Sequence, residues 1–288
     1  MIHSRLVRVD DRASVRVVWT GRGFMAAYAL RLSDSELARY QQMAQRARET
    51  EPEFWELAGI RAGAHIVDVG CGPGAVLAVM AGVVGPAGSA TGVDADAGAI
   101  ERATAVIEAE GLSQASARVG QADATGLAEG AYDVAMLRHV LAHNGGHEQA
   151  IVDHLGTLVR PGGCVYLVDV EATMTRIQPP VPELTELRER YFAFQTAQGN
   201  DLQVGLRLAE LLRAAGLDVL EHRGRLHTIT PQPGQRGPAW AARESMVAAG
   251  FATPEELIRW DKAFADLATA PRPPTYFVVG FLAIGRRP

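Results

Sequence analysis

The sequence has few of the features that would point to an extracellular, membrane or nucleic-acid-binding protein. It contains only two cysteines among 288 residues, Cys71 and Cys164, too few for a disulfide framework. No apolar run approaches the ~20 residues that a membrane span requires, and the first residues lack the apolar core of a signal peptide. The net charge of −5 argues against nucleic acid, because phosphate binding needs a basic face. We therefore expect a cytoplasmic protein with neither a membrane nor a nucleic-acid partner.

A metal site is also not expected. His139, His143 and His147 recur at intervals of four, which is the spacing of ligands on one helix face. However, the segment Asn144-Gly145-Gly146 interrupts a helix between the second and third histidine, and no carboxylate lies nearby at a ligand-like spacing. The pattern therefore predicts no metal. His143 could be a general base, a partner for substrate or a packed structural residue.

The most informative segment joins a short apolar strand, residues 64–69, to three glycines at alternate positions, Gly70, Gly72 and Gly74. Small residues with good helix propensity follow at Ala75. This pattern predicts a buried parallel strand, a tight turn and a helix start. Glycine permits unusual backbone angles and close approach of a ligand, and the helix start offers free N–H groups. We interpret the turn as a cradle for a nucleotide-like cofactor.

Two cofactor classes fit the glycine pattern. The turn matches Gly-x-Gly-x-x-Ala, the dinucleotide pattern of NAD or FAD enzymes. It also matches an acidic residue, Asp68, followed by Gly-x-Gly-x-Gly. A second strand ends at Asp94, whose carboxylate can accept from both ribose hydroxyls in either class. Asp94 could instead cap the following helix, although Asp96 is better placed for that role.

The order of the later motifs separates these classes. A third strand runs into Gln121-Ala122-Asp123-Ala124, a fourth leads into Arg138-His139, and a Pro161-Gly162-Gly163 turn precedes a fifth. In this order the sequence resembles the class I S-adenosylmethionine-dependent methyltransferases, in the branch that modifies small molecules and natural products. The resemblance implies a set of cofactor-binding residues: Tyr28, Asp68, Gly70, Cys71, Gly72, Gly74, Asp94, Ala95, Asp123, Ala124 and Arg138. His143 and Tyr28 are its candidate catalytic residues.

Strands alternate with helices, which predicts an α/β fold with a mostly parallel sheet covered on both faces. The resemblance implies a Rossmann-like sheet of seven strands in the order 3-2-1-4-5-7-6, the last strand, near residues 276–284, being antiparallel. We expect an N-terminal arm and helical lid over residues 1–57, then a methyltransferase domain over 58–288. Within that domain we expect a substrate cap at about 171–215 and 237–270.

The resemblance implies transfer of a methyl group from S-adenosylmethionine, with S-adenosylhomocysteine as product, to a small molecule of secondary metabolism. A carbon of an electron-rich aromatic such as an indole is one acceptor. Methylation of an oxygen or a nitrogen is an alternative, and so is a non-methylating descendant of the fold that only binds the cofactor. The sequence does not identify the acceptor, the atom methylated, the use of a base or the oligomeric state. A homodimer through residues 1–20 is a further hypothesis.

Overall fold

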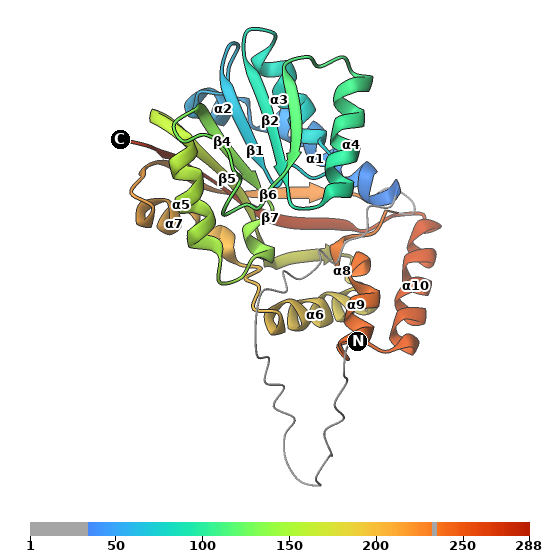
Figure 1. Cartoon of the computed structure of the whole chain (residues 1–288). Helices are drawn as coiled ribbons and strands as arrows, with labels where there is room; N and C mark the ends of the chain where they lie inside the picture. The colour runs from blue at the N-terminus through green and yellow to red at the C-terminus, as the bar shows by residue number, and fades with distance from the viewer. Residues whose placement is uncertain (1–33, 232–234) are drawn as a thin grey trace, which may run out of the picture.

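The computed structural model describes residues 34–231 and 235–288, and its centre is a seven-stranded sheet (Figure 1). Along the sheet the order is β3-β2-β1-β4-β5-β7-β6, as predicted. Strands β1 to β5 run parallel, whereas β7 is antiparallel to both β5 and β6. The strands are β1 His65–Val69, β2 Ser89–Asp94, β3 Ala115–Val119, β4 Tyr132–Arg138, β5 Val159–Gln178, β6 Asp218–Ile229 and β7 Thr275–Arg286.

Helices cover both faces of this sheet, which is why alternate residues of its central strands enter different cores. Ile66 of β1 packs in the core beneath α1, α2 and α3, whereas Val67 and Val69 pack in the core beneath α5 and α7. Burial on both faces explains the continuous apolar run of β1. The helices of the first half are α1 Asp34–Thr50, α2 Pro52–Ala58, α3 Ala75–Val84, α4 Ala97–Ala109, the 3₁₀ turn η1 Leu141–His143 and α5 Glu148–Leu158.

The second half adds a helical layer beyond the parallel strands. Helix α6 packs against α8, α9 and α10, and this group lies below the sheet in Figure 1. Trp260 is fully buried there, and its indole N–H donates to Glu186 at 3.0 Å. The bounds are α6 Pro182–Ala197, η2 Val204–Arg207, α7 Leu208–Ala214, α8 Pro238–Ala241, α9 Arg243–Ala248 and α10 Pro254–Ala268.

Helix α7 belongs to a different layer, because it packs on β6, β7 and α5. Residues 171–215 therefore divide between the helical layer and the sheet. The short turn η2 precedes α7 and packs against β5, where a Cβ on Gly205 would lie 2.7 Å from the Val170 carbonyl oxygen.

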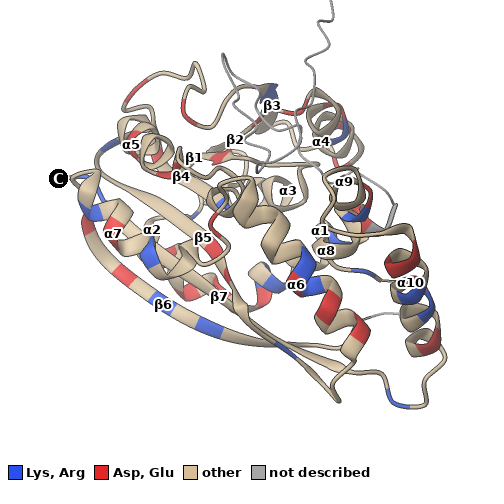
Figure 2. Ribbon diagram, turned by 90° about the horizontal axis from the view of Figure 1, so that it is seen from below, with Lys and Arg blue, Asp and Glu red and all other residues tan. Residues whose placement is uncertain are grey.

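Charged side chains are intermixed on the outside. Figure 2 shows acidic and basic residues together on α6, α10 and β6. Across the ranges that the structure describes, no helix is long and apolar enough to cross a membrane.

Candidate functional site

The glycine turn after β1 is packed too tightly for any side chain. Gly70, Gly72 and Gly74 have φ values of 73°, 54° and 85°, in the left-handed region that favours glycine. A Cβ on Gly70 would lie 2.3 Å from Val140 Cγ2, and one on Gly74 would lie 2.9 Å from the Ala103 Cα. The turn is thus held between the residues that follow β4 and helix α4, and the N-terminus of α3 directly follows it.

Asp94, at the end of β2, fastens this turn. One carboxylate oxygen accepts from the Gly72 N–H at 2.8 Å, and the other accepts from the Asp96 N–H at 2.9 Å. Asp96 is the residue that caps α4, accepting from the Gly98 N–H, as predicted. Burial is the main cause that raises the pKa of Asp94. Each oxygen keeps capacity for a second hydrogen bond, so Asp94 can both hold the turn and accept from a ligand.

Asp68 lies directly before the glycines and is 2% exposed. Within the part of the chain that the structure describes, its carboxylate makes no hydrogen bond. Burial raises its pKa from 3.8 to about 7, against the lowering effect of the Arg138 charge and with a further rise from Asp94. Ionising a carboxylate this deeply buried is costly, which makes Asp68 a candidate ligand-binding group. Cys71, its neighbour in the turn, is a buried free thiol whose pKa is raised by burial, so it is not a reactive nucleophile.

Asp123 and Ala124 form the turn after β3. The Asp123 side chain is 41% exposed and lies 3.8 Å from His147 Nδ1. The next residue, Thr125, is fixed by His154, whose Nε2 lies 3.0 Å from the Thr125 N–H and 2.8 Å from its hydroxyl. The turn is therefore anchored from α5, with Asp123 facing outward at its tip.

Arg138 ends β4 and is bound on both terminal nitrogens by Glu51. Its Nη1 donates to Glu51 Oε2 at 2.7 Å and its Nη2 to Oε1 at 3.0 Å. Tyr166 donates to the same carboxylate at 2.7 Å. Burial raises the pKa of Glu51, but the ion pair with Arg138 outweighs this effect and the pKa is lowered to about 2. The Nε of Arg138 is buried and has no hydrogen-bond partner among the described residues.

His139 follows with a φ of 55°, the only left-handed angle at a residue other than glycine among those described. Burial and then the Arg138 charge lower its pKa to about 3, so the imidazole is neutral. Such a backbone angle costs free energy and tends to occur at functional sites. The His139 N–H donates to the Val168 carbonyl at 2.8 Å, which fixes the turn to β5.

His143 lies on η1 and interacts with the side chain of Gln195 from α6. Burial lowers its pKa, and the hydrogen bond to Gln195 opposes that shift. Gln195 is itself held by Asn200, whose amide donates to it at 2.7 Å. The buried carboxylate of Asp169 accepts from the Ala142 N–H at 3.3 Å and holds η1 from β5. Burial raises the pKa of Asp169 to about 7, despite these backbone hydrogen bonds.

Helix α1 contributes a residue that sequence analysis did not select. Tyr40 covers the glycine turn, so that a Cβ on Gly72 would lie 3.1 Å from its ring. Glu51 and Gln195 were also missed, since neither lies in a motif. Tyr28, predicted to bind cofactor and act in catalysis, and residues 1–20, predicted to form a dimer arm, lie outside the described residues.

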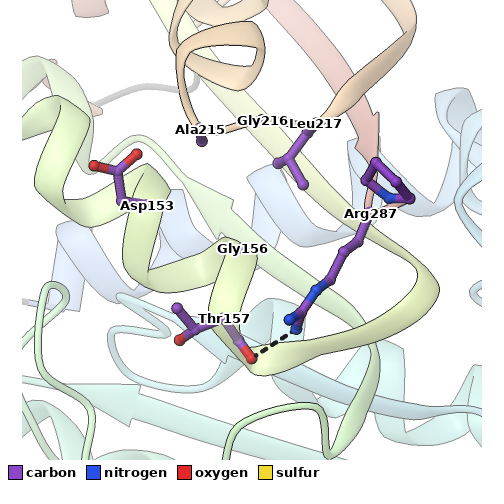
Figure 3. A pocket seen from close by; sticks show the side chains of 8 residues that line it. Asp153, Gly156, Thr157, Ala215, Gly216, Leu217 and Arg287 are labelled. Carbon is purple, nitrogen blue, oxygen red and sulfur yellow. Dashed lines mark hydrogen bonds between the residues drawn. The ribbon is translucent and has the colours of Figure 1, made fainter.

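Two cavities among the described residues lie at the opposite edge of the sheet. Figure 3 shows one of about 380 Å³, lined by residues of α5, by the α7–β6 connection and by Arg287, which donates to the Thr157 carbonyl at 3.3 Å. The residues of α5 and of the α7–β6 connection precede β5 and β6, and Arg287 follows the antiparallel strand β7, whereas the glycine turn follows β1. The described residues include no cluster of three or more potential metal ligands.

Sequence comparison identifies a family for the chain. A family model described as a methyltransferase domain matches residues 39–222. A 37.1 kDa protein of transposon TN4556 from Streptomyces fradiae is 27% identical over 60% of this chain and 49% of its own length. Nocamycin O-methyltransferase of Saccharothrix syringae is 42% identical over 27% of this chain and 28% of its own. The chain thus spans about half or less of the length of these curated relatives.

Solved structures share the fold. A proposed methyltransferase from Bacillus halodurans superimposes with a TM-score of 0.55 at 16% identity, covering 82% of this chain and 97% of that one. A SAM-dependent methyltransferase from Methanosarcina mazei gives a TM-score of 0.50 at 17% identity, covering 78% and 92% of the two chains.

Proposed function

The chain belongs to the methyltransferase-domain family, and from this premise we propose that it transfers a methyl group from S-adenosylmethionine to a hydroxyl group of a small natural product. The observation that carries the proposal is the glycine turn fastened to Asp94, because this arrangement creates a cradle at the carboxyl edge of a parallel sheet.

The residues at this edge fit the cofactor. The three glycines keep side chains out of the turn. Within the described chain, Asp68 is a nearly buried carboxylate without a hydrogen bond, and the Arg138 Nε is a buried donor without a partner. Such groups are costly unless a ligand satisfies them.

We assign roles accordingly. Asp94 and Ala95 would bind the ribose, Asp123 and Ala124 the adenine, and Gly70, Cys71, Gly72 and Gly74 the cofactor through their backbone. Asp68 would accept from the cofactor's amino group, near the backbone of Arg138. Tyr28 stays a prediction for both binding and catalysis.

The cofactor supplies a methyl group made electrophilic by its positively charged sulfur. The protein has to hold the acceptor oxygen in line and remove its proton. We propose His143 for the proton, because its lowered pKa keeps the imidazole in the accepting form and Gln195 orients it. His139, also neutral, would exclude water and bind the acceptor from the same turn.

The preference for oxygen rests on the neutral imidazoles and on the match to nocamycin O-methyltransferase. An indole carbon remains the competing acceptor, since its ring electrons attack the methyl group before the proton on that carbon is removed. We also keep the lid over residues 1–57 and the caps at about 171–215 and 237–270 as proposals. The Gln195–His143 contact supports a cap that includes α6.

The test incubates the purified protein with S-adenosylmethionine and two panels, hydroxylated polycycles and indoles, each analysed by mass spectrometry and NMR. A product heavier by one methylene, with the methyl on oxygen, supports the proposal. Methylation of an indole carbon overturns the oxygen assignment. Release of no S-adenosylhomocysteine with any acceptor, together with no binding of it in calorimetry, overturns the cofactor.

A further inference from the structure

Glu51 joins four parts of the chain at one buried point. It lies between α1 and α2 and is 5% exposed. Its carboxylate binds Arg138 of β4 through two hydrogen bonds and accepts a third from Tyr166 of β5. Arg225 of β6 approaches the same carboxylate at 3.7 Å and donates to the Thr50 carbonyl at 2.6 Å. The end of α1 is therefore tied to three strands.

Among the residues that bind Glu51, Arg138 lies beside the candidate cofactor site. Arg138 is followed by the left-handed turn at His139, and Val140 of that turn presses on Gly70. The Arg138 charge also acts on Asp68, whose pKa it lowers against the effect of burial. The position of the Arg138 guanidinium therefore affects both the backbone and the charge beside the glycine turn.

The same carboxylate also fixes helix α1. Tyr40 of this helix covers Gly72, and its ring would not keep that position if the α1–α2 junction moved. Packing also supports the junction, because Phe54 of α2 lies beneath Arg223 and Arg225 at 4.9 Å and 5.5 Å from the ring centroid.

We propose that Glu51 is a positioning residue for cofactor binding, which holds the β4 turn through Arg138 and holds Tyr40 over the glycine turn through α1. The inference rests on the proposed function, since it assumes that the cofactor binds at that turn. A buried ion pair is by itself weak evidence for stability, because the desolvation of both charges offsets their attraction. The role of this pair is instead to align the two elements that it joins, α1 and the turn after β4.

The test removes both charges of the Glu51–Arg138 pair together, and only the more distant Arg225, whose side chain is 18% exposed, loses a neighbouring carboxylate among the described residues. In Glu51→Gln, Arg138 loses its counterion, and this variant could unfold. The double variant Glu51→Gln with Arg138→Met keeps the volume and removes both charges, so we expect it to fold with a thermal midpoint close to that of wild type. The matched control is Asp133→Asn with Arg160→Gln, which removes an ion pair of 2.7 Å at the opposite edge of the sheet.

Two measurements decide the outcome. In calorimetry, the double variant should bind S-adenosylhomocysteine at least tenfold more weakly than wild type, whereas the control binds normally. In hydrogen exchange without cofactor, the amides of α1 should lose protection in the double variant only. Unchanged affinity and unchanged α1 protection in the folded double variant would overturn the inference. If wild type binds no S-adenosylhomocysteine, the proposed function fails, and the exchange result then shows separately whether Glu51 holds α1.

Discussion

The carboxylate of Asp94 accepts a hydrogen bond of 2.8 Å from the backbone N–H of Gly72, and this contact joins the end of β2 to the turn after β1. The two residues are 22 positions apart in the sequence. Because the parallel pairing of β1 and β2 brings their carboxyl ends together, one side chain can shape the cradle and still accept from a ligand.

Replacing Asp94 with alanine should weaken S-adenosylhomocysteine binding at least tenfold, because both the turn anchor and the ribose acceptor are lost. Leaving the Gly72 N–H without its partner should also lower the free energy of unfolding by about 1–3 kcal/mol. Calorimetry and denaturant unfolding measure the two effects. Asp96→Ala is the control: it should lose about 1 kcal/mol of helix-cap stability but keep its affinity. Equal affinity losses in the two variants would contradict the role of Asp94.

Gly70→Ala should destabilise the protein and abolish cofactor binding, since the added Cβ would lie 2.3 Å from Val140 at a φ of 73°. Gly82→Ala offers a matched control within α3, where no described residue beyond its own helix lies within 4 Å of an added Cβ. That substitution should raise the free energy of unfolding by about 0.5–1 kcal/mol, because alanine has the higher helix propensity. Thermal unfolding with and without S-adenosylhomocysteine compares the two variants. If the Gly70→Ala variant bound the cofactor product as well as wild type, the glycine turn would not be the cofactor site.

Asp68 should make stability depend on pH. Its pKa in the folded protein, about 7, lies above the ordinary value of 3.8. Its favourable contribution to the free energy of unfolding is therefore complete below about pH 4, and it is lost as the pH rises through about 7. We expect the thermal midpoint to fall over this window, and Asp68→Asn to make the fall smaller. Above the window the variant should be more stable than wild type yet bind S-adenosylhomocysteine more weakly.

Asp169 has a pKa raised to about 7 as well, so part of the pH dependence should remain in Asp68→Asn. A variant with the full wild-type slope would show that Asp68 is ionised in the folded protein throughout. Differential scanning fluorimetry across this pH range makes the comparison.

Methyl transfer should not decline as the pH falls toward the ordinary histidine pKa of about 6.5. Burial lowers the pKa of His143, so its neutral form persists below that value. His143→Asn should reduce kcat by roughly 10²–10⁴-fold with little change in cofactor affinity, as expected for loss of a general base. His147→Asn, at a side chain 68% exposed, is the control and should be near wild type. A loss confined to KM would instead assign His143 to acceptor binding.

Much of the fold follows from local sequence. The β-branched run before Gly70, the alternation of strands with helices and the resemblance to a known family together predicted the seven-stranded sheet and its order, and the structure confirms both. The cap of α4 by Asp96 was likewise predictable, because N-capping depends on residues within one turn of the helix. The glycine spacing predicted the conformation of the turn for the same reason.

What sequence alone could not determine are contacts between segments far apart in the chain. The sequence shows Glu51 only as an acidic residue before a proline, and its burial against Arg138 and Tyr166 exists only after α1, β4 and β5 assemble. Gln195 reaches His143 only because α6 and η1, which lie far apart in the chain, meet in the folded protein. The close approach of Gly205 to Val170 likewise exists only because η2 packs against β5. Local propensity and periodicity therefore determined the helices and strands and their order along the chain. The burial of charged groups and the partners of each imidazole were decided by packing, because desolvation acts only once the tertiary structure has formed.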